Sequence, residues 1–128
     1  MADRNVSKRA FIAGWILSGL IAAFFILGGI VGLTQGDKMA DDVRKMGWEP
    51  RQMTILTIVE IACAIVYLIP KTAGLGAILL TGYLGGAVAV HVRINDPLLV
   101  VPVVFGVLVW LGLYLRDARL RALVPLRT

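Results

Sequence analysis

Several polar side chains stand together in a sequence that is otherwise strongly apolar. The stretch GGAVAVHVRINDP, at 85–97, places a histidine, an arginine, an asparagine and an aspartate between positions 91 and 96. A further acid, Glu60, lies well inside another apolar segment. Histidine and carboxylic acids can donate hydrogen bonds to a bound molecule and exchange protons with it. These residue types indicate a site for ligand binding or proton handling.

Glu60 occupies a position that is costly for an acid. A carboxylate is unfavourable among lipid tails, so Glu60 must face the bundle interior or water, find a partner or retain its proton. Thr57 lies about one helical turn before Glu60 and Tyr67 about two turns after it, so helical spacing places the three side chains on one face. We therefore expect Thr57, Glu60 and Tyr67 to contribute to the site.

His91 is expected near the outer end of the next helix, roughly 9 Å from the level of Glu60 along the membrane normal. Side chains lean toward the start of their own helix, so Glu60 and His91 lean toward each other if the two helices are antiparallel. A contact between them, direct or through water, is the prediction. The alternative is a histidine bonded at the interface and a protonated Glu60 bonded to a backbone carbonyl.

The remaining polar residues of the stretch fit the ends of helices. Arg93 points to nearly the opposite face from His91, where it can reach lipid headgroups or pair with Asp96. Asn95 and Asp96 precede Pro97, which is a favoured residue at the start of a helix. We expect Asn95 and Asp96 to cap that helix, rather than to contact a ligand.

Several kinds of chemistry are excluded or disfavoured by composition. The single cysteine, Cys63, rules out an internal disulfide, a CxxC pair and a metal site with several cysteines. His91 and Glu60 supply too few ligands for a metal site. No nucleophile triad or phosphate-binding loop can be assembled, so no catalytic residue is assigned.

The elements that must position these residues are membrane-spanning helices. The chain has 128 residues, of which 59% are hydrophobic, and a mean hydropathy of +0.85. Four apolar segments are each long enough to cross about 30 Å of hydrocarbon. They lie at 10–33, 53–69, 72–92 and 98–115. The expected fold is an all-α membrane protein, an antiparallel four-helix bundle that forms one transmembrane domain over 1–128.

Glycine pairs in two of these segments favour close helix packing. Gly28 and Gly32 form a GxxxG motif in the first segment, and Gly82 and Gly86 form another in the third. Small residues at this spacing let helix backbones approach each other, within one chain or between chains.

The segment 34–52 between the first two spans is longer than a turn requires. Met39, Val43 and Met46 recur at helical spacing, opposite charged residues. A short amphipathic helix on the outer membrane surface is expected here. The alternative is a solvated loop that covers the bundle.

The distribution of charge predicts the orientation of the chain. The net charge is +5, and most lysines and arginines lie near the two termini and in the turn around Lys71. Because positive charge is retained on the cytoplasmic side, both termini are expected to be cytoplasmic. The basic residues flank spans and are not interleaved with aromatics on a soluble face, so their expected partners are anionic lipid headgroups and not nucleic acid.

Three stretches resemble the DoxX-like family of small four-helix bacterial membrane proteins. They are GGIVGLTQ at 28–35, IVEIACAIVYLIPKTAGLGAILLTGYLGGAVAVHVRINDP at 58–97, and GVLVWLGLYLRDARLRALVPLR at 106–127. The resemblance covers nearly the whole chain and implies a multi-pass protein of the bacterial inner membrane. The family often carries a lysine soon after the first helix, where this chain has Gln35 or Lys38.

The resemblance also implies a class of function. The family is named for the small subunit of a thiosulfate:quinone oxidoreductase, and other members are linked to membrane redox complexes. We therefore expect a quinone-like lipophilic ligand, bound near His91 and Glu60, and a redox partner protein or a homo-oligomer. Two other functions are open: a structural or assembly subunit that docks a larger membrane complex, and a small-solute transporter that acts as an oligomer. The sequence leaves open whether the chain is an enzyme.

Overall fold

A computed structural model describes residues 7–34 and 36–124, and this part of the chain contains helices and no β-strands. Four helices are long: α1 (Lys8–Thr34), α3 (Pro50–Leu68), α4 (Ala73–Arg93) and α5 (Val100–Arg116). Together with the short turns that precede α4 and α5, they are long and apolar enough to cross a membrane. The expected all-α, four-helix membrane fold is confirmed. Gln35 lies outside the described residues.

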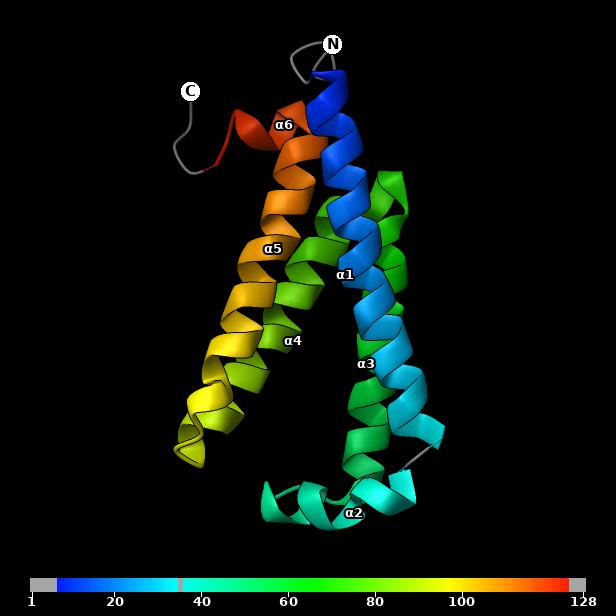
Figure 1. Cartoon of the computed structure of the whole chain (residues 1–128), viewed down its shortest axis with the longest axis vertical. Helices are drawn as coiled ribbons and strands as arrows, with labels where there is room; N and C mark the ends of the chain where they lie inside the picture. Colours follow the sequence, from blue (N-terminus) through cyan, green and yellow to red (C-terminus); the bar gives the residue numbers. More distant parts are fainter. Residues whose placement is uncertain (1–6, 35, 125–128) are drawn as a thin grey trace.

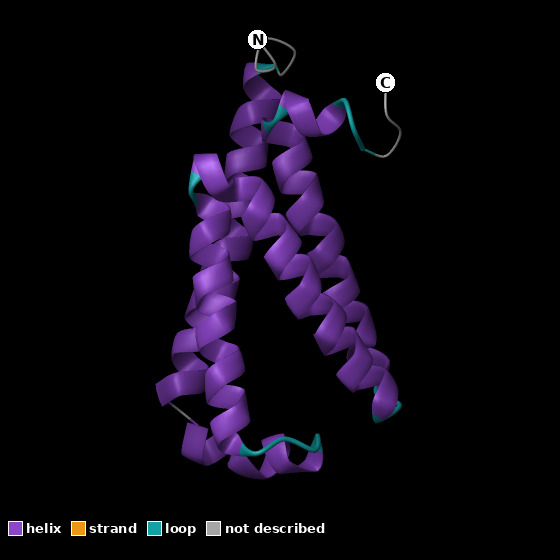
Figure 2. Ribbon diagram, turned by 180° about the vertical axis from the view of Figure 1, so that it is seen from behind, coloured by secondary structure: helices purple, strands orange, loops and turns teal. Residues whose placement is uncertain are grey.

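The long helices form a ring in which each packs against two others. Helix α1 packs against α3 and α5, and α4 packs against the same two helices. Figure 1 shows that α1 and α3 meet α4 and α5 at one end of the molecule and diverge from them toward the other. Figure 2 shows the same divergence from behind. We call the narrow end, where α1 begins and α5 ends, the terminal end, and the wide end the α2 end.

The core lies near the terminal end, where small residues let the helices approach closely. Tyr67, Leu80 and Val109 are fully buried. A methyl group added at Gly112 would stand 2.7 Å from the Ser18 hydroxyl oxygen, so a larger residue there would displace the side chains that pack against this glycine. Large apolar side chains on the outside of the bundle are exposed, as is expected of helices that face lipid.

Short elements connect the spans and explain where the helices begin. Helix α3 begins at Pro50, earlier than the predicted start at 53, because the side-chain oxygen of Gln52 accepts a hydrogen bond from the Glu49 amide at 2.9 Å in a capping box. Helix α4 follows a 3₁₀ turn, η2 (Pro70–Thr72), and α5 follows another, η3 (Pro97–Leu99). A last helix, α6 (Ala118–Arg121), follows α5.

The amphipathic helix expected between the first two spans is present as α2 (Gly36–Lys45). Val43 is only 8% exposed, whereas Asp41 and Arg44 on the other face are exposed and form an ion pair at 3.6 Å. Helix α2 packs against α3 and α1. The side chain of Met39 is not among those described. Helix α2 therefore lies at the wide end of the bundle, against the ends of α1 and α3 (Figure 1).

Candidate functional site

A cavity of about 550 Å³ lies between α3 and α4 at the α2 end. Its walls are mostly apolar, and the cavity volume lies within the range of small-molecule pockets. The lining residues are Met46 and Trp48 from the loop after α2, Met53, Leu56, Val59 and Cys63 from α3, and Ile78, Leu79, Gly82, Tyr83, Gly86, Ala87, Val90 and His91 from α4. This composition suits a lipophilic ligand that needs few hydrogen bonds.

Two glycines of α4 help to keep this cavity open. A methyl group added at Gly82 or at Gly86 would meet no atom within 4 Å. This GxxxG pair does not bring two helices of one chain together, because the divergence of the helices leaves these positions facing space; packing between chains, the other expectation for this motif, stays a prediction. The close approach of α4 occurs instead at Gly76, where an added methyl group would collide with the backbone of Tyr67.

The loop between α2 and α3 forms the outer wall of the cavity. Gly47 adopts a φ of +88°, a conformation that favours glycine, and the chain reverses there so that the Trp48 amide donates to the Val43 carbonyl at 3.1 Å. The loop lies against the end of α4, because a methyl group added at Gly47 would stand 3.4 Å from a guanidinium nitrogen of Arg93. Arg93 is exposed and approaches this loop.

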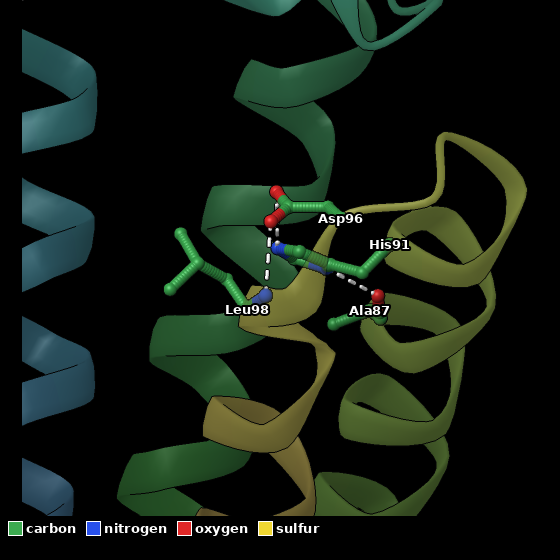
Figure 3. Close-up of polar contacts among 4 residues, drawn as sticks. All are labelled: Ala87, His91, Asp96 and Leu98. Atoms are coloured by element: carbon green, nitrogen blue, oxygen red, sulfur yellow. Dashed lines mark hydrogen bonds and ion pairs between the residues drawn. The ribbon is translucent and has the colours of Figure 1, made fainter.

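His91 is held at the edge of the cavity by two partners. Its Nδ1 lies 2.7 Å from the Ala87 carbonyl oxygen, and its Nε2 lies 3.9 Å from a carboxylate oxygen of Asp96 (Figure 3). A carbonyl oxygen can only accept, so Nδ1 carries a hydrogen. Nε2 is the ring nitrogen left to exchange a proton with the carboxylate or with a ligand.

Asp96 has a double role in this arrangement. One carboxylate oxygen accepts a hydrogen bond from the Leu98 amide at 2.9 Å and so caps η3, as the sequence predicts (Figure 3). The other oxygen faces the imidazole of His91. Asn95 is exposed with a φ of 55° and makes the turn before the cap. The alternative pairing of Asp96 with Arg93 is not formed, because the carboxylate turns to His91.

Glu60 meets Tyr83 and not His91. The Tyr83 hydroxyl donates a hydrogen bond to Glu60 Oε2 at 3.4 Å, and both side chains are partly buried. The predicted direct contact between Glu60 and His91 is not formed, because His91 lies about 12 Å further along α4 than Tyr83. Tyr83 lines the cavity, so Glu60 acts on the cavity through the tyrosine.

Sequence reasoning missed Tyr83, although a signal for it exists. The turn at Pro70–Thr72 joins α3 and α4 tightly, so residues equally far from the turn lie at equal heights on the two helices. Glu60 precedes the turn by about as many residues as Tyr83 follows it. Counting outward from the turn in both directions identifies the pair.

Thr57 and Tyr67 lie in helix contacts outside the cavity. The Thr57 hydroxyl donates to the Met53 carbonyl at 2.8 Å, and its side chain packs beside Gly29 and Gly32 of α1. The Tyr67 hydroxyl donates to the Val109 carbonyl at 2.7 Å near the terminal end. Of the four predicted ligand-binding residues, His91 lines the cavity and Glu60 reaches it through Tyr83, whereas Thr57 and Tyr67 face α1 and α5.

A second, smaller cavity adjoins the first on the other side of α4. It has a volume of about 240 Å³, and Ala87 and His91 line both cavities. Its remaining walls are apolar and include Phe24 and Phe105, whose rings stack at 4.5 Å. His91 is therefore the polar residue that borders two apolar spaces. Within the described residues, no group of three or more potential metal ligands is found.

Comparison with known proteins identifies the family of the chain. A family model described as the DoxX-like family matches residues 16–112, which include α3, α4 and both cavities' polar residues. The resemblance seen in the sequence is thereby confirmed. No curated protein and no solved structure matches the chain significantly.

Proposed function

Because the chain belongs to the DoxX-like family and is an integral membrane protein, we propose that its cavity between α3 and α4 binds a lipophilic, quinone-like molecule as part of a membrane redox system. The observation that supports this proposal is the apolar cavity of about 550 Å³ with His91 and Tyr83 in its wall. A quinone is apolar except for two carbonyl oxygens, which accept hydrogen bonds. An apolar pocket with a few polar side chains has the matching chemistry.

The polar side chains have separate roles in this proposal. The Tyr83 hydroxyl has one hydrogen, which it donates to Glu60 Oε2 at 3.4 Å in this structure, and it turns that hydrogen from Glu60 to a ligand oxygen when a quinone binds. His91 holds or moves a proton at Nε2, and Asp96 connects the imidazole to the surface of the α2 end. Both His91 and Asp96 are partly exposed, so protons can reach them from the solvent.

The walls of the cavity contribute binding and exclusion of water. Trp48 and Met46 cover the cavity from the α2–α3 loop, and the aliphatic side chains of α3 line it. A bound quinone supplies reversible transfer of two electrons and two protons. In this proposal a redox partner protein exchanges electrons with the bound quinone. We also propose that the protein lies in the bacterial inner membrane, as the resemblance to its family implies.

The proposal is tested by filling the cavity without disturbing the fold. A side chain at Gly86 enters the cavity, and an added methyl group there meets no atom within 4 Å. Gly85, the matched control, also has free space but does not line the cavity. Wild-type protein, Gly86→Leu and Gly85→Leu are purified in mild detergent, and the quinone extracted from each is quantified by mass spectrometry.

Wild-type and Gly85→Leu protein are expected to retain quinone near one molecule per chain, and Gly86→Leu about tenfold less. A tenfold loss corresponds to about 1.4 kcal/mol of binding free energy. A side chain that blocks the cavity is expected to cost at least that much. Equal retention by the two leucine variants, or no quinone in the wild-type protein, contradicts the proposal. A wild-type protein that carries no quinone but co-purifies with another membrane protein favours a structural or assembly subunit.

A further inference from the structure

A buried arginine lies at the terminal end, far from the cavity described above. Arg116, the last residue of α5, is only 6% exposed. Its guanidinium carbon lies 4.0 Å from the ring centre of Trp15 and 5.0 Å from that of Tyr67. One guanidinium nitrogen donates to the Tyr67 backbone carbonyl at 3.0 Å. Two aromatic rings and one carbonyl oxygen therefore hold the cation in place.

The positive charge of Arg116 is not neutralised within the described part of the chain. No carboxylate there lies within ion-pair distance of the guanidinium, and Nε is enclosed without a hydrogen-bond acceptor. The neighbouring carboxylate of Asp117 accepts instead from the Arg119 amide at 2.9 Å, where it caps α6. A buried charge is costly unless an anion and acceptors accompany it. No carboxylate of the described residues is paired with this guanidinium.

Arg116 lines a third cavity, with a volume of about 360 Å³. Lys71 from the turn between α3 and α4 and Arg119 from α6 also line it, and both are exposed. Asp117 is the one acid in the wall, so three cations face one carboxylate. Phe11 and Trp15 from the start of α1 form an apolar side of the same cavity. The cationic residues come from two parts of the chain, the turn before α4 and the junction of α5 and α6.

We propose that this cavity is a binding site for a phosphate group, with Arg116 at its base and Lys71 and Arg119 at its rim. Arginine and lysine are the side chains that bind phosphate oxygens best, and an added phosphate supplies the missing negative charge and acceptors. The cavity lies at the ends of α1 and α5, where headgroups meet the protein, and its aromatic side suits an acyl chain or glycerol. An anionic phospholipid and free phosphate share this chemistry. The proposal does not depend on the quinone site.

The test removes the two rim cations and leaves Arg116 in place. Lys71→Ala combined with Arg119→Ala changes exposed side chains only, so the fold is retained. Lys45→Ala combined with Arg51→Ala makes the same change of charge on exposed residues of the α2 end and is the matched control. Each delipidated protein is titrated with phosphatidylglycerol, with diacylglycerol of the same acyl chains and with inorganic phosphate, and binding is followed by native mass spectrometry and by thermal unfolding.

Wild-type and control proteins are expected to bind phosphatidylglycerol and to unfold at a higher temperature with it. The Lys71→Ala, Arg119→Ala protein is expected to bind at least about tenfold more weakly. If inorganic phosphate gives the same stabilisation and the same dependence on the rim cations, the site binds free phosphate. Equal binding of phosphatidylglycerol by the two double variants, or equal binding of diacylglycerol by the wild-type protein, overturns the proposal.

Discussion

The polar residues of this protein divide into two kinds by what they touch. Tyr83, His91 and Asp96 lie in or beside the cavity between α3 and α4, with Glu60 behind the tyrosine. Tyr67 makes hydrogen bonds inside the core. Loss of a side chain of the first kind is expected to change ligand affinity, and loss of the second kind to change stability. Two phenylalanine substitutions separate these effects.

Tyr83→Phe removes the hydroxyl that faces the cavity and keeps the ring. Because one hydrogen bond contributes about 1 kcal/mol, the affinity for a short-chain quinone is expected to fall about fivefold. Glu60 also loses its donor, but it is only partly buried, so stability is expected to fall by about 1 kcal/mol or less. Trp48 lines the same cavity, so quenching of its fluorescence reports binding. Tyr114→Phe, at the terminal end, is the control. An unchanged affinity for Tyr83→Phe would mean that the hydroxyl does not contact the ligand.

Tyr67→Phe is expected to destabilise the fold and to leave quinone binding unchanged. Its buried hydroxyl donates to the Val109 carbonyl at 2.7 Å and lies 3.1 Å from the Ser18 hydroxyl oxygen. Two buried polar groups lose their partner, at a cost of about 1–3 kcal/mol. Thermal unfolding in detergent measures the loss, with Tyr114→Phe again as the control. A variant as stable as the wild type but deficient in quinone binding would return Tyr67 to the ligand site.

Helix ends and helix lengths follow from the sequence, whereas the relative heights of side chains on neighbouring helices do not. The position of α2 is predicted by the spacing of Val43 among charged residues, and the cap at Asp96 by the proline after it. The partner of Glu60 depends on how tightly α3 and α4 are joined. Lipid and core both select aliphatic residues, so positions that face lipid and positions that face another helix look alike in the sequence. The sequence therefore does not reveal that the helices diverge at the α2 end.

The close contact of α3 and α4 near their turn depends on Gly76. A methyl group there would collide with the backbone of Tyr67, so Gly76→Ala is expected to lower the free energy of unfolding by about 1–3 kcal/mol. Gly74→Ala is the control, because nothing lies within 4 Å of a methyl group at that position. Thermal unfolding of both variants in detergent tests this. A Gly76→Ala protein as stable as Gly74→Ala would show that the helices are not in contact there.

At the scale of the whole molecule, the bundle is narrow at the terminal end and wide at the α2 end (Figure 1). The narrow end holds the buried Arg116, and the wide end holds the apolar cavity and the pair His91 and Asp96. The two proposed sites therefore lie at opposite ends of the spans. They face opposite sides of the membrane if the helices cross it as expected.

The excess of cations at the terminal end predicts that this end is cytoplasmic. A green fluorescent protein fused after Thr128 is expected to fluoresce, and alkaline phosphatase inserted in the loop at 46–49 is expected to be active in the periplasm. The control is the opposite pair of fusions, alkaline phosphatase after Thr128 and green fluorescent protein in the loop at 46–49, and both should be inactive. The reverse pattern would place the proposed quinone site and the pair His91 and Asp96 on the cytoplasmic side.

The most direct measurement of the quinone proposal is to map where a photoreactive quinone analogue attaches to the protein in native membranes. Labelled peptides identified by mass spectrometry are expected from 46–63 and 78–91, with labelling suppressed by excess unmodified quinone and by Gly86→Leu. Labelling confined to the lipid-facing surfaces of α1 and α5, around Leu20 and Val107, would contradict the account. So would labelling of the cavity residues that unmodified quinone does not suppress.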